Sequence, residues 1–141
     1  MTKPLAVITG ASSGIGEATA KAFSAVGYPT LLLARRLERM EALSLPNSMC
    51  RQVDVRNRDE LVAAIREAEA EYGPTDMIFN NAGVARLADI GTQPPEDWDE
   101  MIAINTNGVM NGVYAVMGQM KERRTGTIVN MSSIAGRKVY D

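Results

Sequence analysis

The 141-residue sequence has no histidine and only one cysteine, Cys50. Without histidine, neither a Ser-His nor a Cys-His catalytic pair can form, and few of the usual zinc ligands remain. A single cysteine cannot form an internal disulfide, which favours a cytoplasmic location. The apolar runs, among them Leu5–Ile8 and Leu31–Ala34, are far shorter than a membrane span. These absences argue against a metal centre, a disulfide scaffold and a membrane partner.

The sequence also lacks an excess of charge of either sign. It has 15 basic and 17 acidic residues, which give a net charge of −2, and its basic residues are spread along the chain. Nucleic-acid-binding proteins carry concentrated positive charge, so a nucleic-acid partner is not expected. The hydrophobic fraction of 45% and the charged fraction of 23% are those of an ordinary globular protein. We therefore expect residues 1–141 to form one domain with a buried core.

Short apolar runs alternate with segments of helical periodicity along the chain. The runs predict five strands, at Leu5–Thr9, Thr30–Ala34, Cys50–Val55, Asp76–Phe79 and Thr127–Met131. The periodic segments predict helices from Ile15 to Val26, through Met40 and Leu43, from Asn57 to Tyr72, and from Glu96 to Met120. This alternation is typical of an α/β fold, a doubly wound parallel sheet with helices on both faces. We expect the strand order 3-2-1-4-5, with a ligand crevice where the order reverses.

A glycine-rich turn, Thr9–Gly16, joins the first predicted strand to the first helix. Gly10 allows the tight turn, Gly14 lets the backbone approach a pyrophosphate, and Gly16 permits close packing of the helix on the strand. The spacing is G-x-x-x-G-x-G rather than G-x-G-x-x-G, and no lysine follows as it would in a Walker A loop. The turn therefore predicts a dinucleotide phosphate site, against the simpler alternative of a connecting turn.

Two arginines, Arg35 and Arg36, follow the second predicted strand. Dinucleotide folds that bind NAD usually place an acidic residue there, to hold the ribose hydroxyls. A guanidinium instead binds a 2′-phosphate through charge-assisted hydrogen bonds, and the hydroxyls of Ser12 and Ser13 could add donors. The pattern favours NADP over NAD, with a solvated helix start as the alternative reading of the two arginines.

Five motifs occur in the order and at the spacing found in the short-chain dehydrogenase/reductase family. They are Thr9–Gly16, Asp54-Val55, Asn80–Gly83, Asn105 and Ile128–Ser133. Each is weak alone, but together they are specific, and the sequence resembles this family from Leu5 to Gly136. The resemblance implies an oxidoreductase that transfers a hydride between NADP(H) and a small alcohol or carbonyl compound. There is also a loose resemblance to members that act on small hydroxy acids such as serine.

The resemblance further implies a role for residues at the matching positions. Asp54 would contact the adenine amino group, and Val55 would flank the adenine ring. Thr9 would bridge to the Asn80–Gly83 motif, which steadies the sheet and lies along the cofactor. The implied cofactor-binding residues are Thr9, Gly10, Ser12, Ser13, Gly14, Ile15, Gly16, Arg35, Arg36, Asp54, Val55, Asn81, Ala82 and Gly83.

Two more positions resemble catalytic residues of the family. Asn105 would organise a proton-relay water, and we expect its mid-helix amide to be buried and hydrogen-bonded. Ser133 would hydrogen-bond the substrate carbonyl. Asn107 and Asn111 are alternatives to Asn105, and Ser132 is the alternative to Ser133.

The family's Tyr-x-x-x-Lys pair, which provides the general acid/base, does not occur in the sequence. Tyr140 lies too close to Ser133 and has no lysine after it, and Lys138 is expected to be a solvated loop residue. We therefore interpret the chain as the N-terminal part of a longer enzyme, with an incomplete sheet and no activity by itself. The alternative is a non-catalytic dinucleotide-binding or sensing domain. A pure scaffold is less favoured because it would not need Ser133.

The predicted helix from Glu96 to Met120 indicates how copies of the chain could associate. It carries Met101, Met110, Val113, Tyr114, Met117 and Met120. Methionines at helical spacing usually pack in a core or an interface. In the family that the sequence resembles, this helix contributes to the main subunit interface, so we expect a homo-oligomer.

Overall fold

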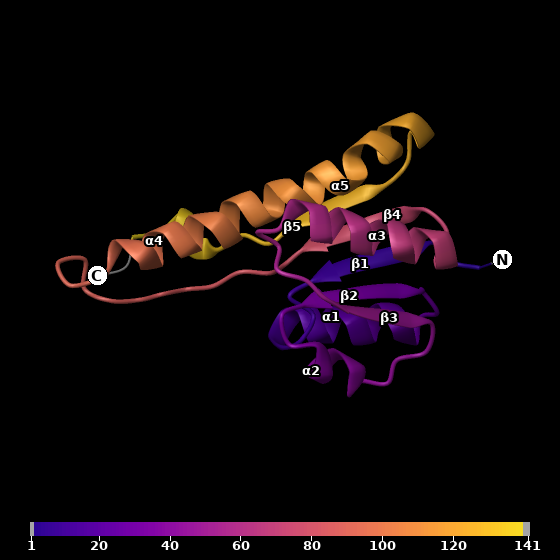
Figure 1. The fold of residues 1–141 in the computed structure, drawn as a ribbon, viewed down its shortest axis with the longest axis horizontal. Helices are drawn as coiled ribbons and strands as arrows, with labels where there is room; N and C mark the ends of the chain where they lie inside the picture. The colour runs from indigo at the N-terminus through magenta and orange to yellow at the C-terminus, as the bar shows by residue number, and fades with distance from the viewer. Residues whose placement is uncertain (1, 140–141) are drawn as a thin grey trace.

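The computed structural model describes residues 2–139 (Figure 1). Its strands are β1 (Leu5–Thr9), β2 (Thr30–Ala34), β3 (Ser48–Gln52), β4 (Thr75–Asn80) and β5 (Thr127–Asn130). They form one parallel sheet in the order β3-β2-β1-β4-β5, so the predicted topology is confirmed. The chain leaves β1 on one side towards β2 and β3, then returns to β4 on the other side. The expected ligand crevice therefore lies at the carboxyl ends of β1 and β4.

Helices follow the strands as the alternating pattern predicts. They are α1 (Gly14–Ala25), α2 (Leu37–Glu41), α3 (Arg58–Tyr72), α4 (Pro95–Ile102) and α5 (Gly108–Arg123). A π-helical turn, η1 (Ala103–Asn107), joins α4 to α5, and a 3₁₀ turn, η2 (Ile134–Gly136), follows β5. α3 begins after Asn57, whose side chain accepts a hydrogen bond from the backbone N–H of Glu60. Within residues 2–139, no helix is both long and apolar enough to cross a membrane.

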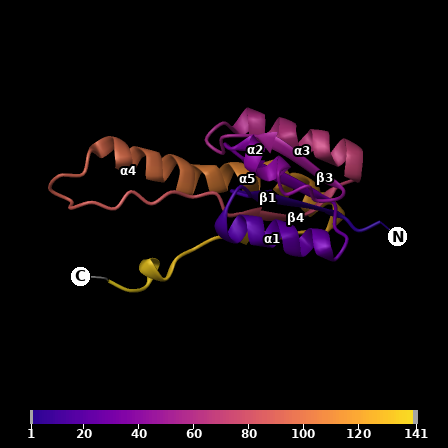
Figure 2. The same ribbon diagram turned by 90° about the horizontal axis from the view of Figure 1, so that it is seen from below.

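Alternate residues of β1 point to the two faces of the sheet. Leu5 and Val7 pack in one cluster with residues of α3 and α5, whereas Ala6 and Ile8 pack in another with residues of α1 and α2. The helices α1 and α3 consequently lie on opposite sides of the sheet (Figure 2). Every residue of β1 and β2 is buried, as near-continuous apolar runs predict for strands covered on both faces.

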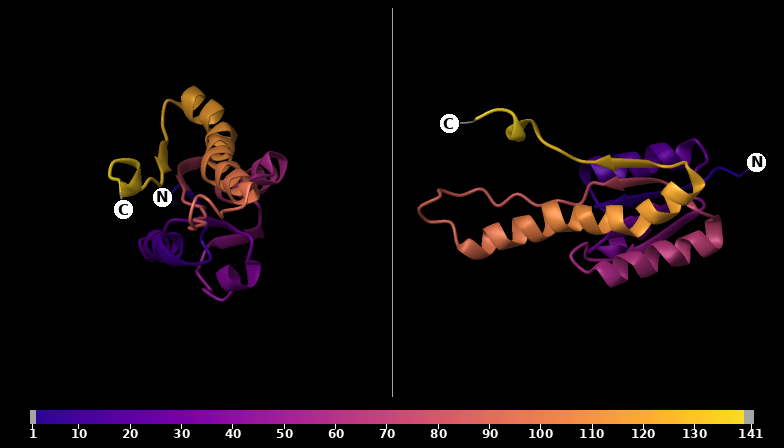
Figure 3. Two further views of the ribbon diagram at one scale, coloured as in Figure 1. Left: turned by 90° about the vertical axis from the view of Figure 1, so that its left-hand side faces the viewer. Right: turned by 90° about the horizontal axis from the view of Figure 1, so that it is seen from above.

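The last strand, β5, forms one edge of the sheet and is covered on one face only. Ile128 packs against the cluster beside α3 and α5. Thr127 and Val129 point to the opposite face and are exposed. After β5 the chain leaves the sheet and runs apart from α4 (Figure 3). The sheet is therefore less complete at β5 than around β1 and β2.

The third strand begins and ends earlier than the sequence predicts. It spans Ser48–Gln52 rather than Cys50–Val55. The last residue of β2, Ala34, pairs with the last residue of β3, so no strand partner remains beyond that point. Val53 and Val55 are nevertheless buried. Their apolar character reflects this burial rather than a place in the strand.

The predicted Glu96–Met120 helix is interrupted at its centre by η1. A π-helical turn holds more residues per turn than an α-helix, which a search for a 3.6-residue period does not reveal. The buried stripe still continues through Ile104, Gly108 and Ala115, whereas Met101 is only half-buried. Together with the loop after β4, α4 extends well beyond the sheet (Figure 3).

Candidate functional site

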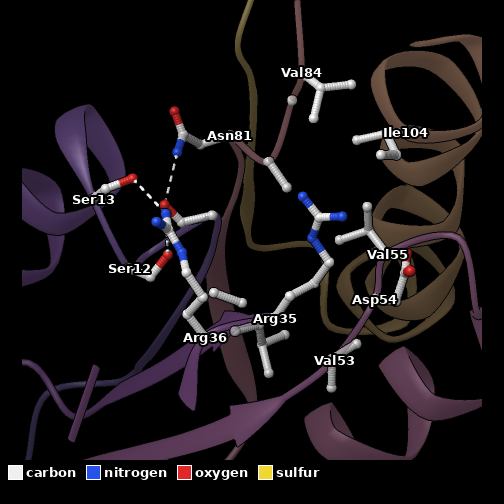
Figure 4. Close-up of a pocket in the computed structure, with 15 residues that line it drawn as sticks. Ser12, Ser13, Arg35, Arg36, Val53, Asp54, Val55, Asn81, Val84 and Ile104 are labelled. Carbon is white, nitrogen blue, oxygen red and sulfur yellow. Dashed lines mark hydrogen bonds between the residues drawn. The ribbon is translucent and has the colours of Figure 1, made fainter. Parts of the chain in front are cut away.

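A cleft of about 510 Å³ opens at the carboxyl ends of β1, β2 and β4 (Figure 4). Ten of the predicted cofactor-binding residues line it: Gly10, Ser12, Ser13, Arg35, Arg36, Asp54, Val55, Asn81, Ala82 and Gly83. They come from four loops that are far apart in the sequence. A parallel sheet brings these loops together because all its strands end at the same edge.

The glycine-rich turn is shaped by close packing on one side and by open space on the other. Gly10 has a φ of 63°, and a Cβ there would lie 2.9 Å from the Cα of Ala82. A Cβ on Gly16 would clash with the carbonyl oxygen of Gly10. Gly14 has a φ of 57°, yet a Cβ on it would meet no atom within 4 Å. The turn therefore packs tightly against the loop after β4 and leaves the start of α1 open, where backbone N–H groups can bind an anion.

Thr9 ties the turn to the Asn80–Gly83 motif. Its Oγ1 accepts hydrogen bonds from the backbone N–H groups of Asn81 and Ala82, both at 3.0 Å, and donates to the Phe79 carbonyl oxygen at 3.3 Å. The Asn81 Nδ2 donates in return to the Thr9 carbonyl oxygen at 3.2 Å. Thr9 is 2% exposed, so these bonds form away from water. They fix the two loops that face each other across the sheet's reversal point.

The two arginines after β2 are held differently. The Arg36 guanidinium donates through Nη2 to the hydroxyl oxygens of Ser12 and Ser13, at 3.1 and 3.2 Å (Figure 4). The Arg35 side chain makes no hydrogen bond or ion pair with any other residue in the range 2–139, although it lines the same cleft. The Arg36 guanidinium and two serine hydroxyls are thus assembled at the cleft wall. Beside them lies the Arg35 guanidinium, whose N–H donors have no partner among residues 2–139.

Asp54 and Val55 form the opposite part of the wall. The Arg56 side chain donates to both carboxylate oxygens of Asp54, and these hydrogen bonds hold the pKa of Asp54 below its ordinary value. The carboxyl group is therefore ionised at neutral pH. Val55 is 7% exposed, and its carbonyl oxygen accepts a hydrogen bond of 2.8 Å from the side chain of Asn111.

Asn105 is not buried, which corrects the expectation for this residue. The buried stripe of the helix passes through Ile104 and Gly108, so Asn105 lies beside it and is exposed. Its amide is still hydrogen-bonded: Oδ1 accepts from the N–H of Val84 at 2.8 Å, and Nδ2 donates to the Val84 carbonyl oxygen at 2.7 Å. Asn111, one of the alternatives, is the buried asparagine, at 4% exposure.

Three other predicted residues lie outside the cleft lining. Ser133 is exposed, and its hydroxyl accepts a hydrogen bond from the N–H of Ala135 at 3.1 Å, at the start of η2. Ile15 is 60% exposed, and Gly14 faces open space. Tyr140 lies outside the described residues. The structure therefore brings most of the cofactor-binding candidates to one cleft, but Gly14, Ile15 and Ser133 do not line it.

The sequence matches the short chain dehydrogenase family over residues 4–141. The chain belongs to this family. One relative, the acetoacetyl-CoA reductase of Rhizobium meliloti (strain 1021), is 38% identical over 136 residues, covering 95% of this chain and 56% of the relative. Another, the NADP-dependent 3-hydroxy acid dehydrogenase YdfG of Salmonella typhi, is 35% identical over 144 residues, covering 96% of this chain and 56% of the relative.

Solved structures of the family agree in fold. The closed form of serine dehydrogenase complexed with NADP⁺ matches with a TM-score of 0.91 and 34% sequence identity. The match covers 96% of this chain and 56% of that one. The chain thus spans about half the length of the short-chain dehydrogenases that it matches.

Sequence reasoning missed parts of this short-chain dehydrogenase site. Val84 and Ile104 complete the cleft wall, but isolated apolar residues in a loop and a helix carry no local signal. Arg56 was missed too. The signal was present in that case, because a residue two places after an aspartate often donates its backbone N–H to that side chain. Arg56 does so at 3.0 Å.

Proposed function

We propose that this chain forms the NADP(H)-binding part of an oxidoreductase that transfers a hydride between NADP(H) and a small alcohol or carbonyl compound. The observation that carries the proposal is the pair Arg35 and Arg36 on the cleft wall, with the hydroxyls of Ser12 and Ser13 beside them. A 2′-phosphate would gain charge-assisted hydrogen bonds there, whereas NAD offers only ribose hydroxyls.

The rest of the cleft has the chemistry that a dinucleotide needs. The open start of α1 at Gly14 would take the pyrophosphate, and Asp54 with Val55 would take the adenine. Asn81 and Ala82, whose backbone N–H groups are held by Thr9, would lie with Gly83 along the nicotinamide half. When bound, the cofactor would supply the redox chemistry, and the residues of this chain would bind and orient it.

The relatives support this cofactor and a small substrate. One is an NADP-dependent 3-hydroxy acid dehydrogenase, and the serine dehydrogenase structure is complexed with NADP⁺. Their substrates by name are hydroxy acids, and the acetoacetyl-CoA reductase acts on a related oxygenated acyl group. We propose a hydroxy acid or its keto counterpart as the substrate class of the whole protein.

Catalysis by these 141 residues alone is not expected. Ser133 and Asn105 are proposed to contribute to the active site, but no Tyr-x-x-x-Lys pair occurs in the sequence to transfer the proton. A second candidate function is therefore a dinucleotide-binding or sensing domain without turnover. The observation that favours it is that most of the predicted cofactor-binding residues line the cleft, whereas Ser133 does not.

The test is a titration of the chain with NADPH and with NADH, followed by nucleotide fluorescence. We expect NADPH to bind at least about tenfold more tightly, because a single charge-assisted phosphate contact has that value. Equal affinities would overturn the cofactor proposal. Measurable oxidation of serine or a 3-hydroxy acid by the chain alone would overturn the proposal that it lacks turnover.

We also propose that the chain self-associates through α5. Met110, Tyr114 and Met117 lie on one face of this helix and are 63%, 67% and 50% exposed. Met120, expected in the same methionine series, instead packs in the core at 8% exposure. An exposed apolar face of this kind favours association. Sedimentation velocity should detect a dimer or larger species that Met117→Glu weakens, and a monomer at all concentrations would contradict the proposal.

A further inference from the structure

The Asp54 carboxylate, which lines the cleft, is bound by Arg56, which does not line it. The Arg56 Nε donates to both carboxylate oxygens at 3.0 Å, and Nη2 donates to Oδ2 at 2.5 Å. The backbone N–H of Arg56 adds a bond of 3.0 Å to Oδ1. Among the described residues, Asp54 lines the cleft whereas Arg56 does not. The hydrogen bonds of Arg56 therefore reach the cleft through Asp54.

Arg35 lies within electrostatic reach of two carboxylates, and each of them already has another arginine. The pKa of Asp54 is lowered mainly by its hydrogen bonds from Arg56, and the charge of Arg35 adds to this. The pKa of Glu100 is lowered mainly by its hydrogen bond from Arg86, and the charges of Arg56 and Arg35 add to this. Arg35 itself forms no hydrogen bond or ion pair within residues 2–139. Its donors are thus left available on the cleft wall (Figure 4).

We infer that Arg56 is a positioning residue for cofactor specificity: by occupying the Asp54 carboxylate, it keeps the Arg35 guanidinium free to bind a 2′-phosphate. This inference rests on the proposed NADP(H) function and names a residue behind that site. Asp54 keeps one role, to present a fixed acceptor to the adenine. Arg56 prevents Asp54 from becoming the ion-pair partner of Arg35.

The competition follows from simple electrostatics. An ionised carboxylate without a partner attracts the nearest free guanidinium, and a bidentate pair between them engages the same donors that a phosphate needs. A phosphate would then have to break that pair before binding. Arg56 holds the Asp54 carboxylate through its backbone N–H and its side chain. Because the carboxylate is occupied in this way, it cannot also form a bidentate pair with Arg35.

The test measures the affinities of the whole chain for adenosine 2′,5′-bisphosphate and for 5′-AMP by calorimetry. The ratio of the two affinities isolates the 2′-phosphate, because contacts with adenine and the 5′-phosphate cancel. We expect Arg56→Gln to lower this ratio about threefold, because the competing pair between Arg35 and the partly exposed Asp54 carboxylate would be weak. Arg56→Lys should lower it less, since lysine keeps the charge but lacks the planar pair of donors.

Two further variants separate this role from a structural one. In Arg56→Gln combined with Asp54→Asn, the amide cannot attract Arg35 as a carboxylate does, so the ratio should return towards that of the unmodified chain. Arg51→Gln removes a comparable exposed pair, Arg51–Glu67 at 2.6 Å, and should leave the ratio unchanged.

The possible outcomes distinguish this inference from the proposed function. An unmodified chain with no preference for the 2′-phosphate overturns the NADP(H) assignment, and with it the role of Arg56. A clear preference that Arg56→Gln leaves intact overturns the role of Arg56 alone. A preference lost in Arg56→Gln and still absent in the double variant would mean that Arg56 supports the fold of the loop, which also contradicts the inference.

Discussion

The side chain of Asn111 in α5 donates a hydrogen bond of 2.8 Å to the carbonyl oxygen of Val55, on the far wall of the cleft. Its Oδ1 accepts a second bond, of 2.9 Å, from the Nε of Arg58. Asn111 is 4% exposed, so both partners depend on it for hydrogen bonding within the protein. One buried amide thus joins α5 to the loop that precedes α3.

Replacing Asn111 with alanine should destabilise the fold. The Val55 carbonyl would be left buried without its partner, at a cost of about 1–3 kcal/mol in the free energy of unfolding. Urea denaturation followed by circular dichroism measures this change. Asn107→Ala is the matched control, because Asn107 is exposed and caps nothing. It should change stability by less than about 0.5 kcal/mol. Equal effects of the two changes would contradict the role given to Asn111.

Gly112 and Gly118 lie in the same helix but have opposite surroundings. A Cβ on Gly112 would clash with the side chain of Asn80, whereas one on Gly118 would meet no atom within 4 Å. Gly112→Ala should therefore cost about 1–3 kcal/mol through overpacking. Gly118→Ala should be neutral or stabilise by up to about 1 kcal/mol, since alanine favours helix. Thermal unfolding of both variants tests this, and a stable Gly112→Ala protein would be inconsistent with the packing described.

Replacing Arg35 with alanine should weaken NADPH binding by about tenfold or more and change NADH binding little. The lost guanidinium would contact only the 2′-phosphate, so the loss belongs to one nucleotide. Fluorescence titration with both nucleotides gives the two affinities. Arg39→Ala in α2 is a control for the general loss of positive charge near the site. If Arg35→Ala weakens both nucleotides equally, Arg35 does not select the cofactor.

Glu69 should make stability depend on pH below neutrality. Burial raises the pKa of this carboxyl, but hydrogen bonds from Arg66 and Thr75 outweigh burial, and the pKa lies below the ordinary value of 4.5. Because the folded pKa is depressed, the stabilisation is complete above pH 4.5 and is lost as the pH falls through the folded pKa. Glu69→Gln should be less stable than the unmodified chain at pH 7, by about 1 kcal/mol.

The pH dependence separates Glu69 from other carboxylates. The difference in unfolding free energy between the unmodified chain and Glu69→Gln should shrink as the pH falls below 4.5, towards pH 3. Glu67→Gln removes the exposed pair with Arg51 and should give a smaller difference throughout. A difference for Glu69→Gln that stays constant from pH 7 to pH 3 would argue against an ionised, hydrogen-bonded Glu69.

Most of the cleft was predictable because its parts depend on local patterns, and the strand order follows from the doubly wound fold that the strand–helix alternation predicts. The apolar run Leu5–Thr9 and the turn to Gly16 predict a buried strand, a tight loop and a helix start, and the structure has all three. The parallel sheet then brings the loops after the strands together without further information. Ser133 could not be placed in this way, because its position depends on where the segment after β5 packs.

The helical register and the burial of single helix residues were harder to predict from the sequence. The sequence predicted one long helix and a buried Asn105, but η1 interrupts that helix and Asn105 is exposed beside Val84. The period of apolar residues identifies the buried face averaged over a whole helix. A single π-helical turn shifts the register, and this changes which polar residue faces the core. Among the asparagines of that predicted helix, Asn111 is the buried one because it lies opposite Val55, a neighbour that is distant in the sequence.

The sequence by itself determined the alternation of strands and helices, the glycine turn and the presence of Arg35 and Arg36 after the second strand. These features act through backbone conformation, periodicity and charge, which are properties of neighbouring residues. Only the tertiary structure decided which arginine is held and which is free: Arg36 is bound by Ser12 and Ser13, while Asp54 is bound by Arg56. That choice depends on side chains from three loops competing for the same partners in one cleft, and such competition exists only after the sheet has brought those loops together.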